Sequence, residues 1–344
     1  MPDSTFDWGG TYSCSYRLME VDRDTWEDSS EVTGVLSLSV SRDRDGELVD
    51  EGSASIAMAS DEEPREFWGR IEVQVSDGVE HVRQPIATLY FVPGRWAMRR
   101  GRKVVDYSCM SVLYPASARK VLVGSSYAKG TDGSAFVVGL LRECTFAPVE
   151  VADTFALSDH VVYDGETSYL EAANMLLDAA GWCLRISERG EVEVRPRPTE
   201  AALSLDIANT RLLAPEVEAD DGLEDAANRF IAAGEEGIAT AVDESDRRTS
   251  FPSRGFYVDE YDSSPQLLDG ETLQGYSDRK LEELNEVSGT RTYTRAFWPG
   301  VVPFDVVDGS IASVGLDCRM RVLSQNVELG AQVKVTETSE VMTS

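Results

Sequence analysis

The chain has 344 residues, and its 61 Asp and Glu against 32 Lys and Arg give a formal net charge of −29. This length provides for about two or three domains, and a hydrophobic share of 42% is enough for packed cores. A surface this acidic repels phosphate backbones and anionic lipid headgroups. General nucleic-acid or membrane-surface binding is therefore excluded unless a basic face is set apart.

The first third of the chain alternates polar and apolar residues with the period of a half-buried strand. We expect strands over residues 34–40, 54–58, 70–75, 85–92 and 103–114. Gly, Pro and polar turns separate them. Strands at this spacing predict a small antiparallel barrel or sandwich.

The period then becomes helical. Apolar residues on one face predict a helix at about 134–143, and a capping box that starts at Ser168 opens a second helix at about 168–180. Gly181 follows where helices commonly end in the left-handed conformation. A hairpin is expected over 182–195. These elements predict a compact α+β unit.

The last part of the chain is acidic and mostly β. Residues 216–246 carry eleven Asp or Glu against one Arg, a run that usually forms a solvated face. The expected elements are paired strands at 228–233 and 238–242, an irregular connection at 251–273, a helix at about 277–287, and strands at 290–297, 301–307, 320–327 and 332–337. The order along the chain is thus β, α+β, then β with one helix.

Few residues are equipped for chemistry. His81 and His160 are the two histidines, and no nucleophile motif lies near either. The signatures of serine hydrolases, zinc proteases, phosphate loops and dinucleotide sites are absent from the sequence, so we expect neither an enzyme nor a cofactor. The segment from Asp43 to Gly46 resembles a calcium loop, but Gly52 stands where a bidentate Glu is required, so we expect a turn.

The cysteines and the N-terminus carry no further signal. The five cysteines are an odd number and widely spaced, which indicates neither disulfides nor a zinc site, and we expect them to be small buried side chains. The N-terminus lacks the pattern of a signal peptide, and no apolar run is long enough for a membrane span. We therefore expect a protein made in a cytoplasm.

One cluster of positive charge interrupts the acidic chain. Four cations fall within five residues at the bend between two expected strands: Arg99, Arg100, Arg102 and Lys103. The cluster is either a charged hairpin tip or a docking site for an acidic neighbour, including another copy of the same chain. Nucleic acid is the third option.

The order of several segments is informative as a set. In chain order, a Trp-bearing stretch at 21–26 is followed by strands at 32–40 and 52–58 and by paired strands at 85–92 and 104–113. The α+β elements at 133–141 and 165–196 come next, and a returning strand follows at 228–231. From about residue 21 to 307, this order resembles the baseplate or tail-tip hub proteins of long-tailed bacteriophages and prophages. The resemblance is one of architecture, because that family has no catalytic signature to compare.

The resemblance implies an α+β, mainly β fold: two small antiparallel barrel-like domains at 1–125 and 201–344, with an inserted α+β domain at 126–200. It implies a structural virion protein at the tail tip, a homotrimer that joins the distal tail or tail tube protein to other tip proteins. Its ring would line the channel through which the tape-measure protein and DNA leave, with DNA only in transit and no direct membrane insertion. Assembly would take place in the cytoplasm of the bacterial host. Longer relatives add an endopeptidase or receptor-binding extension, and since none follows here we expect no fused lysin.

Two other functions stay open. A carboxylate-based cell-wall hydrolase would need two acidic groups with different pKa values, and 61 acidic residues supply such pairs by chance. A host-receptor or carbohydrate-binding module would need exposed Trp or Tyr. The six tryptophans are scattered along the chain, which is more typical of core anchors than of a sugar platform.

Overall fold

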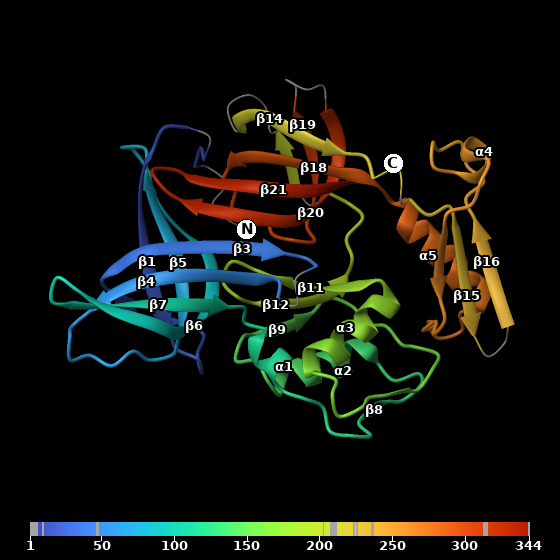
Figure 1. Ribbon diagram of the computed structural model, residues 1–344, viewed down its shortest axis with the longest axis horizontal. Helices are drawn as coiled ribbons and strands as arrows, with labels where there is room; N and C mark the ends of the chain where they lie inside the picture. The colour runs from blue at the N-terminus through green and yellow to red at the C-terminus, as the bar shows by residue number, and fades with distance from the viewer. Residues whose placement is uncertain are drawn as a thin grey trace.

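Strands dominate the computed structural model of the chain, and most of them pair antiparallel (Figure 1). The structure describes residues 6–8, 10–45, 48–201, 203–206, 212–222, 224, 226–234, 237–311 and 316–342. One large sheet is built from both ends of the chain, and a helical insert and a small three-stranded sheet are attached to it.

The N-terminal half of the large sheet contains seven strands. They are β1 (Ser13–Val21), β2 (Asp28–Val32), β3 (Val35–Asp43), β4 (Asp50–Met58), β5 (Phe67–Ser76), β6 (His81–Arg99) and β7 (Arg102–Met110). In β5 the buried Ile71, Val73 and Val75 alternate with more exposed polar residues, as the predicted period of two requires. The five strands predicted in this part are confirmed, and β1 and β2 are added to them.

Two connections in this half deserve comparison with the predictions. The last predicted strand ran to Tyr114, but β7 ends at Met110, because a turn and then a short helix with Pro115 in its first turn follow it. The predicted turn after Asp43 is present, and the backbone N–H of Asp45 donates to the Asp43 carboxylate over 3.0 Å. Gly46, the last residue of that predicted turn, lies outside the described residues.

The C-terminal half contributes six strands. They are β13 (Leu203–Asp206), β14 (Leu212–Asp220), β18 (Val287–Ala296), β19 (Val306–Ile311), β20 (Leu316–Leu329) and β21 (Val333–Met342). The strand predicted at 301–307 is wrong in its first five residues. The N–H of Val302 donates to the Asp305 carboxylate over 3.0 Å, the N–H of Asp305 donates back to the Val302 carbonyl over 3.1 Å, and Phe304 has a φ of 73°. These contacts form a tight turn, so β19 begins only at Val306.

The two halves form one continuous sheet because β20 pairs with β3. The register places Ser324 opposite Asp43 and Val327 opposite Val40. The strand order along the main path is β14-β18-β21-β20-β3-β4-β7-β6-β5-β1-β2. Within the described residues this path does not close on itself, so the paired strands form an open sheet and no closed barrel is seen.

Charged side chains are buried where the halves meet. The guanidinium of Arg295 pairs with the Glu337 carboxylate, which also accepts hydrogen bonds from the Tyr293 hydroxyl (2.6 Å) and the Gln325 amide (2.8 Å). Arg42 donates to the Gln325 side-chain oxygen over 3.1 Å. Burial opposes ionisation of Glu337, but Arg295 and the hydrogen-bond donors outweigh it and hold its pKa below the usual range. We call these five residues the joint network.

Asp50 lies next to the joint network, and its pKa is shifted in the opposite direction to that of Glu337. Its carboxylate is fully buried, with one oxygen 3.6 Å from the Arg42 Nε. Burial raises the pKa of Asp50 to about 6, because the attraction of Arg42 is weaker than the loss of hydration and Glu188 adds repulsion. Two carboxylates in the same joint therefore have shifts of opposite sign.

The insert lies between the two halves in sequence. Its elements are α1 (Tyr114–Ala118), β8 (Ser126–Tyr127), α2 (Gly133–Arg142), β9 (Val149–Val151), β10 (Val161–Val162), α3 (Tyr169–Ala180), β11 (Trp182–Ile186) and β12 (Val192–Pro196). The predicted capping box is confirmed: the Ser168 hydroxyl accepts from the Glu171 N–H over 3.0 Å, and the Glu171 carboxylate accepts from the Ser168 N–H over 3.2 Å. Gly181 ends α3 with a φ of 72°, as predicted.

A three-stranded unit follows, which we call the small sheet. It contains β15 (Arg229–Gly234), β16 (Gly237–Val242) and β17 (Asp259–Asp262), with α4 (Phe251–Arg254) in a connection and α5 (Leu273–Asn285) against one face. The predicted pairing of the first two strands is confirmed. The irregular connection predicted at 251–273 is wrong in part, because β17 lies within it and pairs parallel with β15. Helix α5 begins four residues earlier than predicted, after the cap Thr272.

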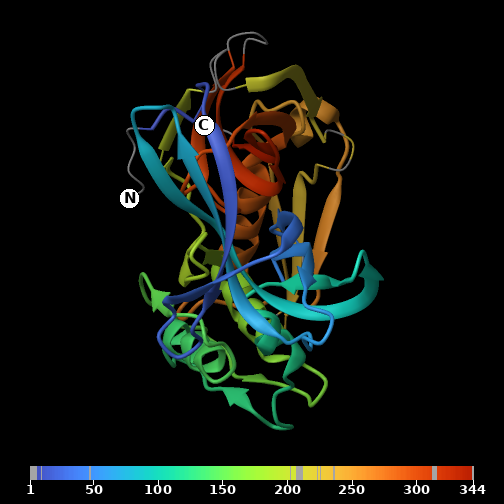
Figure 2. The ribbon, with the colours of Figure 1, turned by 90° about the vertical axis from the view of Figure 1, so that its left-hand side faces the viewer.

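Figure 1 shows how these parts are arranged along the longest axis of the molecule. The N-terminal half of the large sheet lies at the left, the C-terminal half at the upper centre, the insert at the lower centre, and the small sheet with α5 at the far right. Figure 2 looks onto the left-hand end, where the N-terminal strands stand in front and the insert hangs below them. The molecule is therefore elongated, with the β6–β7 hairpin toward one end and the small sheet at the other.

Candidate interaction surfaces

The outer edge of β6 is unpaired near the turn of the β6–β7 hairpin, whereas β4 pairs with β7 as far as Lys103. β5 pairs with β6 only as far as Phe91, and from Val92 onward β6 pairs with β7 alone among the described strands. Arg100 and Gly101 have φ values of 50° and 79°, so both central residues of the turn are left-handed. Such a two-residue turn matches the right-handed twist of a hairpin.

Three residues of the predicted basic cluster lie exposed at the end of this hairpin. The guanidinium groups of Arg99, Arg100 and Arg102 make no hydrogen bond or ion pair with any residue that the structure describes. Lys103 differs, because it is 6% exposed and its ammonium donates to the Glu62 carbonyl over 2.6 Å. The fourth cation of the cluster is thus satisfied within the chain.

Two large apolar side chains lie exposed beside these arginines. Trp96 is 58% and Met98 51% exposed, and Lys103 places its ammonium 5.5 Å from the centre of the Trp96 ring. The sequence analysis missed this pair, although the alternation of Trp96 and Met98 next to a basic bend was the available signal. We call Trp96, Met98, Arg99, Arg100 and Arg102 the hairpin tip.

The other tryptophans follow the prediction that they are core anchors. Trp8, Trp26, Trp68 and Trp182 are buried, and Trp298 is partly buried. Trp96 is therefore the exception within the set. An exposed Trp next to unpartnered cations is a more specific surface feature than a lone exposed apolar residue.

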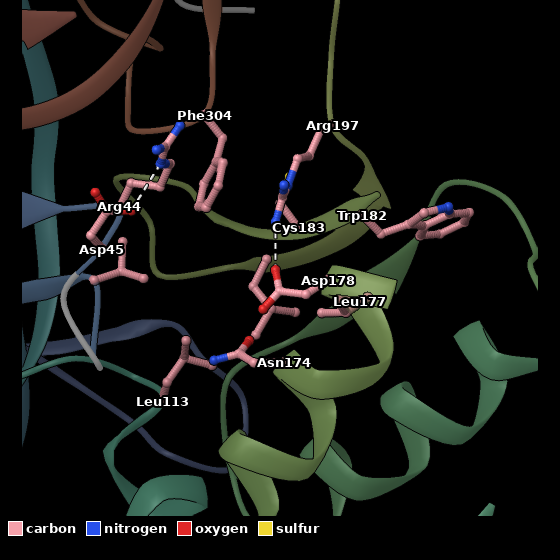
Figure 3. A pocket seen from close by; sticks show the side chains of 12 residues that line it. Arg44, Asp45, Leu113, Asn174, Leu177, Asp178, Trp182, Cys183, Arg197 and Phe304 are labelled. Carbon is pink, nitrogen blue, oxygen red and sulfur yellow. Dashed lines mark hydrogen bonds and ion pairs between the residues drawn. The ribbon is translucent and has the colours of Figure 1, made fainter. Parts of the chain in front are cut away.

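A cleft of about 350 Å³ lies where the insert meets the large sheet (Figure 3). Asn174, Asp178 and Trp182 line it from the insert, and Arg44 and Phe304 line it from the two halves of the sheet. Figure 3 shows Arg197 reaching across to the Asp178 carboxylate. The cleft thus brings together side chains from all three parts of the chain.

The charges of this cleft are bound to one another. Asp178 pairs with Arg197, and its backbone carbonyl accepts from the Lys280 ammonium over 3.2 Å. Burial raises the pKa of Asp178, against the opposing attraction of the two cations. On the other wall, Arg44 donates to Glu340 over 2.8 Å. The Asp178–Arg197 pair lies within the insert and the Arg44–Glu340 pair within the large sheet, and the hydrogen bond from Lys280 joins α5 to the insert.

A second concave surface lies between the N-terminal strands and the insert. It has a volume of about 590 Å³ and an aromatic lining. Trp68 and Tyr90 have ring centres 4.7 Å apart, Tyr114 stacks 6.0 Å from Tyr90, and the half-exposed Phe146 closes the row. Burial and a hydrogen bond to Glu66 raise the pKa of Tyr90 to about 12. We call this surface the aromatic groove.

The remaining predicted residues lie apart from these surfaces or carry no chemistry. His81 and His160 are both exposed, in different parts of the molecule. Cys109 and Cys183 are buried as predicted, whereas the other three cysteines are only partly buried, and all five are free thiols. In the part of the chain that the structure describes, no group of three or more His, Cys, Asp or Glu is placed to hold a metal ion. Among the described helices, none has the length and apolar character needed to cross a bilayer.

The acidic run at 216–246 largely follows its prediction. Six of its acidic residues are exposed: Glu218, Asp220, Asp221, Glu224, Glu244 and Asp246. Asp243 is buried instead, with one carboxylate oxygen accepting from the Ser245 N–H over 3.0 Å. Asp225, Glu235 and Glu236, and the side chain of Glu216, lie outside the described residues. The described part of the run thus supplies solvated negative charge.

Comparison with known proteins gives a result only at the level of structure. No family model matches the sequence, and no match is found among curated proteins. Among solved structures, a tail protein from Neisseria meningitidis MC58 has a TM-score of 0.63 at 12% identity, covering 96% of this chain and 97% of that one. The 43 kDa tail protein of prophage MuSo2 from Shewanella oneidensis has a TM-score of 0.62 at 12% identity, covering 94% and 97%. The prophage tail protein gp18 from Listeria monocytogenes EGD-e has a TM-score of 0.57 at 12% identity, covering 94% of each chain.

The chain has the fold of prophage tail proteins. The match includes nearly the whole of both chains, so the insert and the small sheet belong to this tail-protein fold as well as the large sheet. At 12% identity the likeness concerns backbone architecture. The surfaces described above are therefore features of this chain's own residues.

Proposed function

We propose that this chain is a structural virion protein that forms the hub of a phage or prophage tail tip. The observation that carries the proposal is the match of its fold to prophage tail proteins over at least 94% of both chains. Fold alone does not determine function. The proposal is supported further by the ion pairs that hold the charged residues of the cleft, Asp178 with Arg197 and Arg44 with Glu340.

In this proposal the chain assembles as a homotrimeric ring between the distal tail or tail tube protein and other tip proteins. Its regions are a first barrel-like domain at 1–125, an inserted domain at 126–200 and a second barrel-like domain at 201–344. The β3–β20 pairing and the joint network support the idea of a rigid subunit, because they hold the two β halves in one sheet. A rigid subunit suits a connector, because it holds the tail tube and the tip proteins in fixed positions relative to each other.

The net charge of −29 suits a channel that DNA passes through. A wall that repels phosphates does not retain them, so an acidic lumen would let the tape-measure protein and then DNA leave the tail. DNA is then in transit only, and the protein does not insert into a membrane. The location is the tail tip of the virion, after assembly in the cytoplasm of the host.

Particle mass and imaging test the ring. Light scattering on the purified chain at 1 to 100 μM, chosen as about the range in which specific oligomers form, should give three times the mass of one chain. Negative-stain images should show a ring with a central channel. A monomer over the whole range that also fails to trimerise when mixed with its tail tube protein contradicts the proposal. A ring whose inner wall is basic contradicts the role of the charge.

A second function, binding of a host receptor or carbohydrate, is favoured by the aromatic groove. Stacked rings beside carboxylates and guanidinium groups offer both flat apolar surface and hydrogen-bond partners to a sugar. Titration calorimetry with cell-wall polysaccharide fragments tests it. Binding lost in Tyr114→Ala and Phe146→Ala but kept in Phe256→Ala, an exposed aromatic on another part of the molecule, supports the function, and no heat with any fragment contradicts it.

The cleft is the place where a pair of carboxylates suited to the hydrolase hypothesis lies. Asp178 has a raised pKa there and Asp45 lines the same cleft, but the ion pair with Arg197 favours a structural role for Asp178. Incubation with purified peptidoglycan decides between the two roles. Soluble fragments that disappear with Asp178→Asn would support the hydrolase, and their absence with the unaltered chain would contradict it.

A further inference from the structure

We propose that the aromatic groove binds an organic quaternary ammonium group of the kind that choline carries. The inference goes beyond the proposed hub and does not rest on it, because the groove lies within a single subunit. Three observations carry it: aromatic rings that line one hollow, a carboxylate without a counter-charge beside them, and a cation of the chain itself that already lies over one of the rings.

The rings of the groove come from two parts of the fold. Trp68 on β5 lies directly opposite Tyr90 on β6, so the two side chains share one face of the large sheet. Tyr114, at the start of α1, and Phe146, in the loop after α2, approach this face from the insert. The groove therefore lies where the insert meets the N-terminal strands, and neither part forms it alone.

The rings are inclined to one another instead of lying in one plane. Phe146 is tilted by 65° against Trp68, with 6.4 Å between the ring centres. Trp68 is tilted by 37° against Tyr90, and Tyr90 by 22° against Tyr114. A flat sugar ring needs a flat aromatic surface, whereas a rounded cation is attracted to any ring face within about 6 Å of the ring centre. The hollow of about 590 Å³ between these inclined rings therefore suits a compact cation.

One carboxylate at the groove has no counter-cation. Glu66 accepts a hydrogen bond from the Tyr90 hydroxyl and forms no ion pair with a residue that the structure describes. Of the other two acidic residues in the lining, Glu20 is bound by Arg65 over 2.5 Å, and Asp22 accepts hydrogen bonds from the backbone of its own turn. The groove thus has unbalanced negative charge next to the Tyr90 ring, in a chain whose net charge of −29 attracts cations.

The chain itself already places a cation in the groove. The guanidinium carbon of Arg23 lies 5.4 Å from the centre of the Phe146 ring, within the range of cation–π attraction. Arg23 is exposed, and its Nε is 3.6 Å from the Asp24 carboxylate, beyond hydrogen-bonding distance. No cation from the described part of the chain lies over the rings of Tyr90 or Tyr114 in the same way, so these two rings are left for a ligand.

A quaternary ammonium group suits this lining better than a primary one. The ammonium group of a lysine is strongly hydrated and has three N–H donors to satisfy when it leaves water. The groove offers it ring faces and a single carboxylate without a counter-charge. A trimethylammonium group has no N–H donor, so ring faces are enough to hold it, and the Glu66 carboxylate adds attraction without a hydrogen bond.

Proton NMR of the choline methyl groups, titrated with the whole chain, tests the site. Choline should bind with a dissociation constant on the order of 1 mM. The matched ligand is 3,3-dimethyl-1-butanol, which has the same shape without the charge and should bind at least about 10-fold more weakly. Equal binding of the two ligands would mean a merely apolar groove, and no binding of choline up to about 50 mM would mean no site. Either result overturns the inference.

Substitutions separate the ring faces from the charges. Tyr114→Leu should weaken choline binding about 5-fold while Tyr114→Phe retains it, because the ring face attracts the cation. Glu66→Gln should weaken binding about 3-fold, because it removes the unbalanced charge. Arg23→Gln should strengthen binding about 3-fold, because it removes a like charge and uncovers the Phe146 ring.

The control variant is Tyr261→Leu, which removes an exposed ring of the small sheet and should leave choline binding unchanged. Circular dichroism establishes that each variant is folded. Glu66 and Arg23 are exposed, so their variants keep the test decisive even where Tyr114→Leu does not fold. A loss in Tyr114→Phe as large as in Tyr114→Leu, or weaker binding in Arg23→Gln, overturns the inference.

Two further titrations identify the source of the group and the rival ligand. Sedimentation of the chain with phosphatidylcholine vesicles, weakened by Glu66→Gln, assigns the group to a lipid headgroup, whereas choline binding without sedimentation assigns it to a free or polymer-borne source; both support the inference. Polysaccharide fragments that bind the groove when choline does not would support the receptor function and overturn this inference. A chain that never forms a ring would contradict the hub and leave the groove unaffected.

Discussion

The joint network and the hairpin tip use the same residue type in opposite ways. At the joint, Arg42 and Arg295 are nearly inaccessible to water and hydrogen-bonded to partners from other strands. At the tip, Arg99 and Arg102 are exposed, and no described residue pairs with them. The comparison teaches that charge inside the large sheet fixes the geometry of the subunit, while the arginines of the hairpin tip are exposed and form no ion pair with a described residue.

The largest expected effect comes from removing one charge of the joint. Glu337→Gln keeps the shape of the side chain but leaves the Arg295 guanidinium buried without a counter-charge, which should cost about 4 kcal/mol of unfolding free energy. Denaturant unfolding measures it. Glu328→Gln, an exposed position on the neighbouring strand β20, is the control and should change stability by less than about 0.5 kcal/mol. Equal losses at both positions would remove the distinction between joint and surface.

The pH dependence of Asp50 gives the next largest effect. Its pKa is about 6 in the folded chain against 3.8 in the reference state, so the folded state holds its proton more tightly. The stabilisation from this proton is present below pH 4 and is lost as the pH rises through 6, an amount of about 3 kcal/mol. Relative to the unaltered chain, Asp50→Asn should therefore gain stability between pH 4 and 7. Unfolding curves at these two values measure the gain, and a gain of zero would refute the assignment.

Lys103 tests the comparison between the joint network and the hairpin tip. It lies next to the tip, but like the arginines of the joint network it is buried and hydrogen-bonded within the subunit. Lys103→Met keeps the aliphatic stem and removes the ammonium that donates to Glu62, which should cost about 1.5 kcal/mol. Arg102→Met, one residue earlier, should cost less than about 0.5 kcal/mol. Thermal unfolding of the two variants side by side is the measurement. A larger loss for Arg102 would mean that its guanidinium has a partner within the subunit.

The smallest expected effect is on the stability of a variant in which the charges of the hairpin tip are reversed. R99E/R100D/R102E should unfold within about 0.5 kcal/mol of the unaltered chain in dilute solution, because exposed charges without partners contribute little to stability. Denaturant unfolding below the concentration of association measures it. A loss above 2 kcal/mol, a magnitude typical of buried contacts, would place these arginines among the structural residues.

The sequence was informative wherever structure depends on neighbours along the chain. The capping box at Ser168, the helix end at Gly181 and the paired strands β15 and β16 were all predicted from local pattern, and the structure confirms them. Local pattern failed where a contact from elsewhere decided the outcome. The apolar residues at 301–305 predicted a strand, but the hydrogen bond from the Val302 N–H to the Asp305 side chain stabilises a turn there.

The candidate surfaces were predicted only in part, for the same reason. The basic cluster was visible in the sequence, but burial of Lys103 depends on Glu62, forty-one residues away. The exposure of Trp96 depends on how far β5 extends along β6, which the pattern of β6 itself does not contain. The joint network pairs Arg42 with Gln325, which is 283 positions away, so no local pattern could indicate it.

The pairing of β3 with β20 also affects how the chain is made. During synthesis the N-terminal half emerges from the ribosome first, but the edge of β3 meets its partner only after roughly 280 more residues have been added. At elongation rates of about 5 to 20 residues per second that interval is about 15 to 60 s, during which the strand edge is unpaired. The large sheet is therefore completed only after β20 has been synthesised, and until then the edge of β3 is the part of the N-terminal half that is most prone to mispairing.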